Sequence, residues 1–448
     1  MDKILSTEDI IQLLLSYSAE QLKDLIIGIQ PIDILEAVME YDGERSVLIN
    51  KLSLGLVVKL IDEAGVDDKF ILYELLSESK QKQILRDMAS DELVDFLESL
   101  KPQLAKEIIS KLDKADALEV EKLMGYGPES AGGIMATEFI VVKEDMTVWD
   151  VLHLLQKEGK MAETVNSLYV LNEKGKLKGV VSLNDIVISN FNTRISEIMN
   201  EKVISARTDL DQEEVAHIFQ RYGFTIVPVV DHSYRLQGII TNDDIMDVLR
   251  EESTEDFEKM AALSHSESEY LDTSVVELAK KRFWWLLILM ISATFTGLII
   301  KGFEDALSAV VMLTVFIPML MDTGGNAGTQ SSTLIIRGIA LGELSNKDFF
   351  TILTKEFWVS MLVGSALAIV NFFRILIFDR VSVAMALTVS ISLLLTVVIA
   401  KTVGCVLPLV AKTMKVDPAI MAAPIITTIV DALSLWAYFT LATTILGI

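Results

Sequence analysis

The sequence predicts a multidomain membrane protein. We expect an all-α N-terminal domain of superhelically stacked helices, an α/β domain made of a tandem repeat, and a C-terminal domain of five transmembrane α-helices. Three observations predict this class. A net charge of −24 is combined with a mean hydropathy of +0.44. Helical apolar spacing recurs over the first 130 residues, and an internal repeat occupies residues 138–252.

Charge and hydropathy divide the chain near residue 275. The first 275 residues carry 27 Lys and Arg against 53 Asp and Glu, a net charge of −26, whereas the remaining residues carry 12 against 10. An acidic, water-soluble part therefore precedes an apolar part. The N-terminus lacks the basic head and apolar core of a signal peptide, so we expect the acidic part to stay in the cytoplasm. The single Cys405 excludes an intrachain disulfide and gives no support for a thiolate metal cluster.

Residues 1–130 are expected to form the helical N-terminal domain. Apolar residues recur at helical spacing in segments such as SLGLVVKLIDEAG and SDELVDFLESL, and Ser or Asp often precedes such a segment, as an N-cap would. This recurrence of short helices indicates a small superhelical solenoid. The domain contains no nucleophile–base set and no phosphate-binding loop. The four histidines of the chain pair with no evident nucleophile, so we do not expect an enzyme.

Residues 131–252 contain two copies of one pattern, 59 residues apart. Each copy is expected to fold as strand, helix, strand, hairpin turn, strand and helix. A hydroxyl residue three positions before an aspartate opens the last helix of each copy: Ser182 precedes Asp185, and Thr241 precedes Asp244. This arrangement resembles a tandem pair of CBS domains, which implies that the hydroxyl and the aspartate hold an adenosine ribose. The alternative is that both pairs are N-terminal capping boxes.

Acidic residues are concentrated in the second repeat and after it. One cluster, which contains Asp211 and Glu213, precedes a helix, and a dense run extends from Asp243 into residues 253–275. We expect residues 253–275 to be a connecting amphipathic helix under the membrane. Spacings of three and four place several carboxylates on one helical face, where like charges repel. The run is either a solvated acidic face or a set of carboxylates bridged by divalent cations.

The C-terminal domain, residues 276–448, contains five apolar segments, and a helical span needs about 20 residues. They cover residues 283–300, about 307–332, 357–378, 383–410 and 420–446. Basic residues concentrate before the first segment, after the second and after the fourth. These faces are therefore expected in the cytoplasm and the C-terminus outside. Lys401 and Arg374 lie nearer the ends of their segments and could snorkel to the membrane surface.

Asp431 lies near the middle of the fifth segment, where a charge costs at least about 2.5–3.5 kcal/mol. It either makes a structural hydrogen bond to a neighbouring helix or binds a cation in a pore. The stretch PMLMDTGGNAGTQSS in the second segment supports the pore, because its glycines permit close helix approach or a local helix break. One side of the pore would be lined by Asn326, Thr329, Gln330, Ser331 and Ser332. One carboxylate with many neutral oxygens suits a hard cation such as Mg²⁺.

Taken together, the helical domain, the CBS pair, the connecting helix and the five spans resemble the MgtE family of magnesium channels and transporters over essentially the whole chain. Three motifs carry the resemblance: TGGNAGTQSSTLIIR in the second span, DPAIMAAPIITTIVDALS in the fifth, and TDLDQEEVAHIF in the second CBS copy. The resemblance implies a homodimer in the inner cell membrane, with the pore at the dimer axis, cytoplasmic N-terminal domains and no nucleic-acid partner.

The resemblance also implies roles for particular residues. Asp431 matches the pore aspartate that holds a hydrated Mg²⁺, and the expected pore lining is Gly325, Asn326, Gly328 and Pro424. The expected ligands of regulatory Mg²⁺ are Asp91, Asp95, Asp211, Glu213, Asp244, Asp247, Glu252, Glu255 and Asp256. The expected contacts of ATP as a regulatory ligand are Ser182, Asp185, Phe224 and Thr241. The chain departs from the family pattern at Gly223, where an acidic residue can occur, at Ala423, where Asn or Gly can occur, and at Asp322, where Gly can occur.

The expected mechanism is a channel that Mg²⁺ itself closes. At high cytosolic Mg²⁺, ions bridge carboxylates of the N-terminal and CBS domains, hold the connecting helices and shut the pore. At low Mg²⁺ the carboxylates repel and the pore opens. Import runs down the electrochemical gradient, since the chain has no ATPase motif. Two alternatives stay open: a channel for another divalent cation such as Co²⁺ or Mn²⁺, and a membrane-tethered nucleotide sensor whose spans only dimerise.

Overall fold

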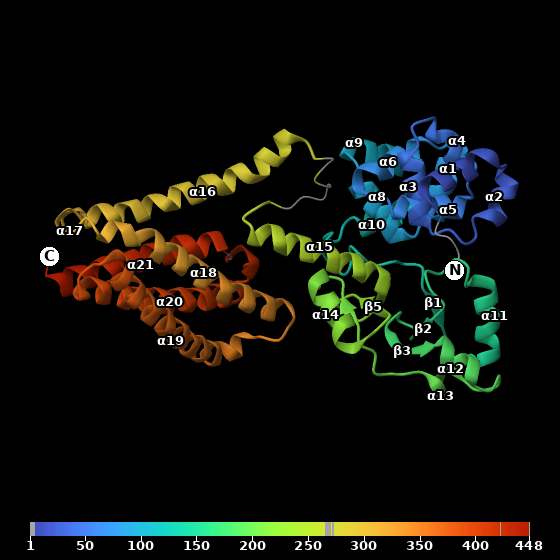
Figure 1. The fold of residues 1–448 in the computed structure, drawn as a ribbon. Helices are drawn as coiled ribbons and strands as arrows, with labels where there is room; N and C mark the ends of the chain where they lie inside the picture. Colours follow the sequence, from blue (N-terminus) through green and yellow to red (C-terminus); the bar gives the residue numbers. More distant parts are fainter. Residues whose placement is uncertain (1–4, 265–269, 271–272, 422, 448) are drawn as a thin grey trace. The chain divides into compact units, whose positions relative to one another are not determined.

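The computed structural model describes residues 5–264, 270, 273–421 and 423–447. The chain divides into two compact units, Met1–Arg250 and Glu251–Ile448. Figure 1 shows the helices and strands of each unit. Each unit has its own hydrophobic core.

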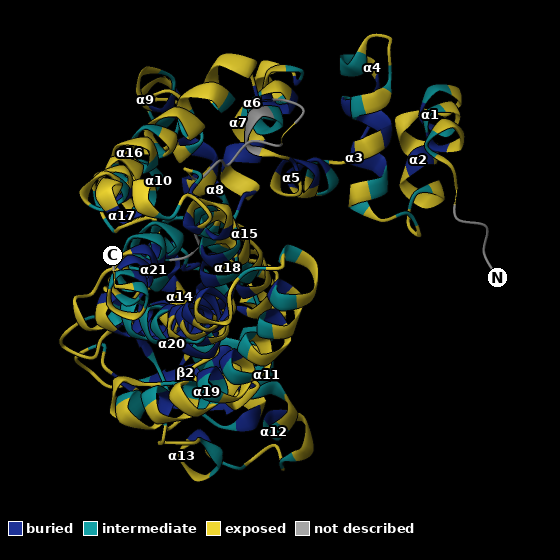
Figure 2. Cartoon of the chain, turned by 60° about the vertical axis from the view of Figure 1, so that its left-hand side comes forward, coloured by how far each residue is buried: buried dark blue, intermediate teal, exposed yellow. Residues whose placement is uncertain are grey.

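The first unit begins with ten short helices. They are α1 (Thr7–Ser16), α2 (Ala19–Leu25), α3 (Pro31–Glu40), α4 (Arg45–Ile49), α5 (Leu54–Asp62), α6 (Val66–Glu74), α7 (Glu78–Asp87), α8 (Ser90–Glu98), α9 (Pro102–Ile109) and α10 (Lys114–Leu123). Alternate helices pack together, α1 on α3, α3 on α5 and α5 on α7, as in a solenoid. Leu14, Ile34 and Phe96 are fully buried between them, and Figure 2 shows both buried and exposed residues on α3 and α5. The predicted all-α domain is confirmed.

Two three-stranded sheets follow, one in each copy of the repeat. The first copy contains β1 (Ile140–Val142), α11 (Val148–Glu158), β2 (Ser167–Leu171), β3 (Leu177–Ser182) and α12 (Leu183–Ile188), and α13 (Ile195–Ile198) follows it. The second contains β4 (Ala206–Arg207), α14 (Gln212–Tyr222), β5 (Ile226–Val230), β6 (Leu236–Thr241) and α15 (Asn242–Met260). In both sheets the first strand is parallel to the second and the second is antiparallel to the third. The shared topology confirms the predicted α/β repeat.

The second copy of the repeat shares its core with the N-terminal helices. Phe219 of α14 and Ile245 of α15 belong to the same buried cluster as Phe96 of α8. The first copy has a separate core around Val148 and Ile186. Because one core runs from the N-terminal helices into α14 and α15, acidic residues of both domains are held in the same region.

The second unit contains the C-terminal part of α15 and the membrane helices. These are α16 (Val275–Gly302), α17 (Glu304–Ala309), α18 (Leu313–Ala340), η1 (Asn346–Asp348), α19 (Phe349–Arg374), η2 (Ile375–Asp379), α20 (Val383–Thr413), η3 (Pro418–Met421) and α21 (Ala423–Leu446). Helix α20 packs against α18, α19 and α21, and α18 also packs against α21. Many residues of α20 are therefore buried, whereas α16 is largely exposed.

Five long helices are present where five spans were predicted. Within the described residues, four of these regions are long and apolar enough to cross a membrane: Val275–Gly302, Asn346–Asp379, Val383–Thr413 and Pro418–Leu446. Helix α18 has 28 residues and thus the necessary length, but polar residues interrupt its apolar sequence. The prediction that α18 also spans rests on its length and on its packing between α20 and α21.

The region of the predicted connecting helix differs from the prediction. Helix α15 begins in the second repeat and ends at Met260, where a positive φ of 53° at Ala262 is incompatible with a continuing helix. Residues 265–269, 271 and 272 lie outside the described residues, and α16 begins at Val275. The acidic run therefore extends the last helix of the repeat, and a single helix does not cover residues 253–275.

Candidate functional site

Carboxylates of the N-terminal helices and of the second repeat meet in one region, called here the acidic junction. Its members are Asp62 of α5, Asp91 and Glu92 of α8, Glu163, and Asp244 and Asp247 of α15. Asp91 is 8% exposed, Glu92 and Asp244 are half-buried, and the other three form an exposed rim. The predicted residues Asp91, Asp244 and Asp247 are thus brought together from two domains.

Burial and mutual repulsion raise the pKa values of Asp62, Asp91, Glu92, Glu163 and Asp244. The pKa of Asp91 is raised well above its ordinary value, first by burial and then by the charge of Asp244. Burial, followed by the charge of Asp62, raises the pKa of Glu92 to about 7. The pKa of Glu163 is raised by burial and by Asp244. Removing water from several like charges is unfavourable, so a bound cation would stabilise this packed arrangement.

The acidic junction fits a hydrated cation better than a fully dehydrated one. Across the described part of the chain, no group of three or more His, Cys, Asp or Glu side chains is arranged to hold a metal ion directly. Mg²⁺ usually keeps several waters and binds through one or two carboxylates, so it does not require such a cage. The donors are oxygens throughout, as a hard cation prefers. The junction residues therefore fit Mg²⁺ held largely through its water shell.

Three of the predicted regulatory residues lie elsewhere: Asp95 on α8, Asp211 before α14 and Glu213 in the first turn of α14. Asp95 is exposed, one turn beyond Asp91 on α8. Asp211 is the N-cap of α14 and accepts a hydrogen bond of 2.9 Å from the backbone N–H of Glu213. A side-chain oxygen at this place satisfies a helix N–H, so Asp211 has a structural role in the packed protein.

Sequence reasoning missed Asp62, Glu92 and Glu163. Glu92 directly follows the predicted ligand Asp91, and this adjacency was the one available signal. Asp62 and Glu163 lie on two other segments, and no spacing in the sequence connects them to Asp91 or Asp244. Only tertiary packing brings Asp62 and Glu163 near the carboxylates of α8 and α15.

A second group of charges lies in the second unit, at the end of α15. Lys259 Nζ lies 2.6 Å from Glu255 Oε1 and 2.6 Å from Asp417 Oδ2. Burial, and then the charge of Asp417, raises the pKa of Asp256 to about 6. Met260 packs against Ile336 and Ala419 beside these ion pairs. Two of the predicted ligands, Glu255 and Asp256, thus share this site with a lysine and with Asp417, neither of which was predicted.

The candidate nucleotide residues form helix caps in this structure. Ser182 Oγ accepts a hydrogen bond from the backbone N–H of Asp185 and donates one of 2.6 Å to Asp185 Oδ2. Thr241 Oγ1 donates one of 2.5 Å to Asp244 Oδ2. Phe224 stacks on Tyr222, with ring centroids 5.4 Å apart. Each copy thus shows one of the two backbone hydrogen bonds of a capping box, Asp185 N–H to Ser182 Oγ in the first and Thr241 N–H to Asp244 Oδ2 in the second, and nucleotide binding by these residues stays a prediction.

Gly223, where the family can carry an acidic residue, has a positive φ of 64° and closes α14 in the left-handed conformation. A residue with a Cβ is strained there, so glycine suits this helix end. The local backbone thus explains the departure at this position.

In the membrane helices, Asp431 lies on α21, next to Val430, which packs against Gly324 of α18. Its Oδ1 atom is buried, with no hydrogen-bond partner among the described residues. A Cβ on Gly324 would lie 2.9 Å from Val430, and one on Gly325 would lie 2.9 Å from Thr427. These glycines allow α18 to approach α21 closely in the turn that precedes Asp431. The structural hydrogen bond considered for Asp431 is not observed.

The polar stretch of α18 is a continuous helix with two different faces. Gly324, Gly325 and Gly328 are buried against neighbouring helices, so they serve close approach and no helix break occurs. Asp322, Asn326 and Gln330, spaced four residues apart, are exposed.

Two hydroxyls expected in the pore wall lie on the buried face of α18. Ser331 and Ser332 are each 1% exposed, and Ser332 Oγ donates to the carbonyl of Met421. Helical periodicity thus turns both hydroxyls away from Asn326 and into the helix bundle of this copy. Pro424 lies in the first turn of α21, and its carbonyl accepts hydrogen bonds of 3.0 Å from Thr427 and Thr428.

Lys401 does not snorkel. It is 6% exposed on α20, its Nζ lies 3.9 Å from Glu356 Oε2 of α19, and it donates a hydrogen bond of 3.2 Å to Ser331 Oγ. The prediction that it reaches the membrane surface is wrong, because a carboxylate on a neighbouring helix compensates its charge inside the bundle.

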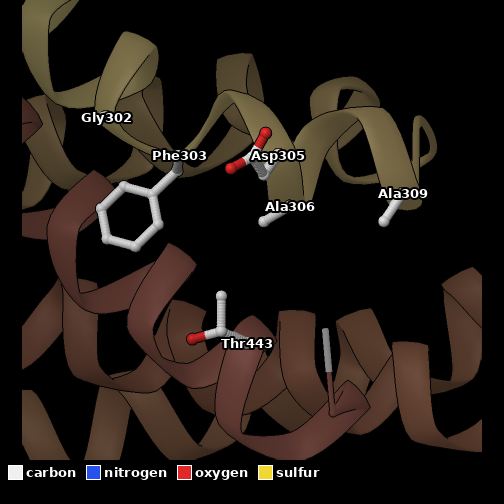
Figure 3. Close-up of a pocket in the computed structure, with 6 residues that line it drawn as sticks. All are labelled: Gly302, Phe303, Asp305, Ala306, Ala309 and Thr443. Carbon is white, nitrogen blue, oxygen red and sulfur yellow. The ribbon is translucent and has the colours of Figure 1, made fainter.

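A cavity of about 300 Å³ lies where α16, α17 and α21 meet. Figure 3 shows its lining, which is Gly302, Phe303, Asp305, Ala306, Ala309 and Thr443. Its lining contains one carboxylate and one hydroxyl among apolar groups, so it offers few groups that could bind a polar ligand. The predicted site residues do not line it.

Comparisons with known proteins cover both units. The family model described as the divalent cation transporter MgtE matches residues 317–441, the MgtE intracellular N domain matches 29–129, and the CBS domain matches 131–189 and 195–251. The chain is 36% identical over 425 residues to the magnesium transporter MgtE of Thermus thermophilus, covering 94% of both chains. It is 32% identical over 435 residues to the magnesium transporter MgtE of Bacillus subtilis, covering 97% of this chain and 96% of that one.

Two solved structures resemble the first unit. One is the cytosolic domain of the Mg²⁺ channel MgtE in complex with ATP, with a TM-score of 0.51 and 36% identity. The match covers 54% of this chain and 99% of that one. The other is the soluble part of a magnesium transporter, with a TM-score of 0.52 and 31% identity. That match covers 55% of this chain and 99% of the other.

Proposed function

Because the chain belongs to the MgtE family of divalent cation transporters, we propose that it carries Mg²⁺ into the cell down its electrochemical gradient, along a path that passes Asp431. It is a multi-pass membrane protein with an intracellular N domain, and it is a transporter homologue, not an enzyme. Relatives that match nearly its whole length are magnesium transporters. This similarity favours Mg²⁺ over Co²⁺ or Mn²⁺ as the substrate.

The buried, unpartnered Oδ1 of Asp431 is the observation that carries the proposed path. A carboxylate inside a helical bundle of the membrane is stable only where water, a cation or a hydrogen-bond donor reaches it, and no described side chain donates to this oxygen. A Mg²⁺ ion with its water shell supplies both charge and donors. The binding is then through water, which lets the ion leave again.

A second copy of the chain would complete the path. The exposed Asp322, Asn326 and Gln330 form a polar line on α18, which is unfavourable against lipid. In a homodimer whose two α18 helices face one aqueous path, these side chains would contact water instead. This arrangement also gives Asn326 the lining role that the sequence predicted.

Gating by Mg²⁺ follows from the acidic residues. Like charges in the acidic junction raise each other's pKa values, so the junction separates readily when no cation is bound. Moving a gate from 1:99 to 99:1 needs about 5.5 kcal/mol. A site occupied at ten times its dissociation constant contributes about 1.4 kcal/mol, so about four regulatory ions are sufficient. Regulatory Mg²⁺ at the junction and beside Asp256 would hold the protein compact and the path closed.

ATP is proposed as a second regulatory ligand of the CBS pair. A cytosolic domain that is 36% identical has been crystallised in complex with ATP. In this chain Asp244 accepts a hydrogen bond from Thr241 and is also a member of the acidic junction. A ribose that hydrogen-bonds to Asp244 would compete with Mg²⁺ for the same carboxylate, so the two ligands would be coupled.

The test is Mg²⁺ influx into proteoliposomes for wild type and Asp431→Asn, with internal Mg²⁺ low and then high. We expect Asp431→Asn to reduce influx by a factor of about ten or more, since each tenfold corresponds to 1.36 kcal/mol in the barrier. Wild-type influx should fall when internal Mg²⁺ is high. Asp305→Asn removes the same charge from a short helix between two spans and is the matched control.

Three results would contradict parts of the proposal. Unchanged influx in Asp431→Asn would move the ion site elsewhere. Influx of Co²⁺ or Mn²⁺ that Mg²⁺ does not inhibit would change the substrate. If no ion is transported under any condition, the tethered nucleotide sensor becomes the better explanation.

A further inference from the structure

One buried charge network joins three membrane helices. Lys401 of α20, Glu356 of α19 and Ser331 of α18 make contact inside the bundle. Lys401 Nζ donates to Ser331 Oγ at 3.2 Å, Ser331 Oγ donates to Glu356 Oε2 at 2.6 Å, and Nζ lies 3.9 Å from that same oxygen. These directions fit a positive lysine and a negative glutamate.

The network is buried enough that its two charges depend on each other. Lys401 is 6% exposed, Ser331 is 1% exposed, and the Glu356 side chain is 14% exposed. An apolar pair of similar volume would pack such a site without the penalty of desolvation, and removing one partner alone leaves a buried charge. A pair of this kind adds little stability, so its contribution lies in directional contacts that fix how the helices are turned.

The contact between α18 and α20 contains a point where the two backbones touch. A Cβ on Gly404 would lie 2.3 Å from the carbonyl oxygen of Gly328, so α18 and α20 touch backbone to backbone at this level. No side chains interlock at this point itself, so groups beside it contribute to holding the rotation of α18. Ser331 lies three residues beyond Gly328, and Lys401 lies three residues before Gly404. The polar network therefore lies one helical turn from the contact between Gly328 and Gly404.

The rotation of α18 decides what its exposed face presents. At 3.6 residues per turn, Asn326 lies about 140° and Asp322 about 180° around the helix from Ser331. Both are exposed, whereas Ser331 is buried. Holding Ser331 between Lys401 and Glu356 thus directs the line of Asp322 and Asn326 away from the bundle.

We propose that Lys401 and Glu356 are positioning residues for ion conduction. They fix the rotation of α18 through Ser331, so that its polar line faces the ion path. This inference rests on the proposed function in one respect, that the exposed face of α18 borders the path. Lys401 and Glu356 do not themselves contact the transported ion.

The rotation can be measured without transport. Cys405 is the only cysteine, and in Cys405→Ser the new hydroxyl can keep the 3.3 Å hydrogen bond to the carbonyl of Thr402. In this background, labelling of Asn326→Cys by a charged methanethiosulfonate reports exposure to water. Leu286→Cys on α16, an exposed apolar position, is the control.

The charge variants are Lys401→Met, Glu356→Gln and the double variant, all in the full-length protein. The double variant leaves no unpaired charge, so it should assemble even if a single variant does not. We expect it to slow labelling of Asn326→Cys at least about fivefold and to reduce maximal Mg²⁺ influx at least about tenfold. Labelling of Leu286→Cys should not change.

A role only in stability predicts a different result. The double variant would then restore wild-type labelling and influx per assembled molecule, and that outcome overturns the proposal. The proposed function fails separately: if Asp431→Asn conducts normally while the double variant still slows labelling, the ion path is wrong but the positioning role stands.

Discussion

Glu92 is the half-buried carboxylate for which the structure predicts the clearest pH effect. Its pKa is raised from 4.5 to about 7 by burial, then by the charge of Asp62. Its Oε2 also accepts a hydrogen bond of 3.3 Å from the backbone N–H of Ala89. Glutamine keeps the size and an acceptor oxygen but removes the charge. We therefore expect Glu92→Gln to stabilise the first unit at pH values where the glutamate is ionised.

The magnitude follows from the shift in pKa. A rise from 4.5 to about 7 corresponds to about 3.4 kcal/mol between the two protonation states. Because the pKa is raised in the folded state, that state holds its proton to higher pH than the unfolded state does. Wild-type stability thus falls as the pH rises from about 4.5 through about 7. The variant should gain at most about 3 kcal/mol at pH 8, and less than about 1 kcal/mol at pH 5.

The assay is urea unfolding of residues 1–260 at both pH values, with EDTA to remove divalent cations. This fragment contains the complete first unit and α15. Glu20→Gln, an exposed change on α2, should alter stability by less than about 0.5 kcal/mol at either pH. Adding Mg²⁺ at pH 8 should stabilise wild type more than Glu92→Gln. An equal gain at pH 5 and pH 8, or a loss at pH 8, would show that the charge of Glu92 does not destabilise the junction.

Three further predictions concern other parts of the molecule. Gly404→Ala should lower the stability of the full-length protein by about 1–3 kcal/mol, since its Cβ would lie 2.3 Å from Gly328 O. Thermal unfolding in detergent measures the loss of stability, and an unchanged midpoint would refute the close contact. Lys259→Gln removes the cation that lies 2.6 Å from Asp417. Mg²⁺ influx at low internal Mg²⁺ should therefore rise, and inhibition of influx by internal Mg²⁺ should become steeper. An unaltered inhibition curve would count against a gating role for Lys259. Ser182→Ala removes the N-cap of α12 and should destabilise residues 1–260 by about 1 kcal/mol. A loss of ATP affinity, measured by calorimetry on the same variant, would support a role of Ser182 in nucleotide binding. Unaltered ATP affinity would restrict Ser182 to helix capping.

Most of the fold could be predicted from local patterns in the sequence. Apolar spacing alone predicts that the N-terminal domain consists of short helices, because each short amphipathic helix must bury one face. The two repeat copies align by order and spacing, and their sheets have the same pairing. Helices α16, α19, α20 and α21 follow from hydropathy. Asp431 could be singled out because a carboxylate amid apolar residues is rare at any register.

The sequence by itself determined the three kinds of domain, the family and the acidic and polar residues that matter, since these depend on short-range periodicity and composition. Tertiary structure decided which of those residues meet. Asp62 and Glu163 lie near Asp91 and Asp244 only because the first unit packs segments together that are distant in the sequence. Lys401 is paired and buried only because α19 places Glu356 beside it. A residue's own neighbours fix its helix and its face, whereas long-range packing fixes what that face contacts.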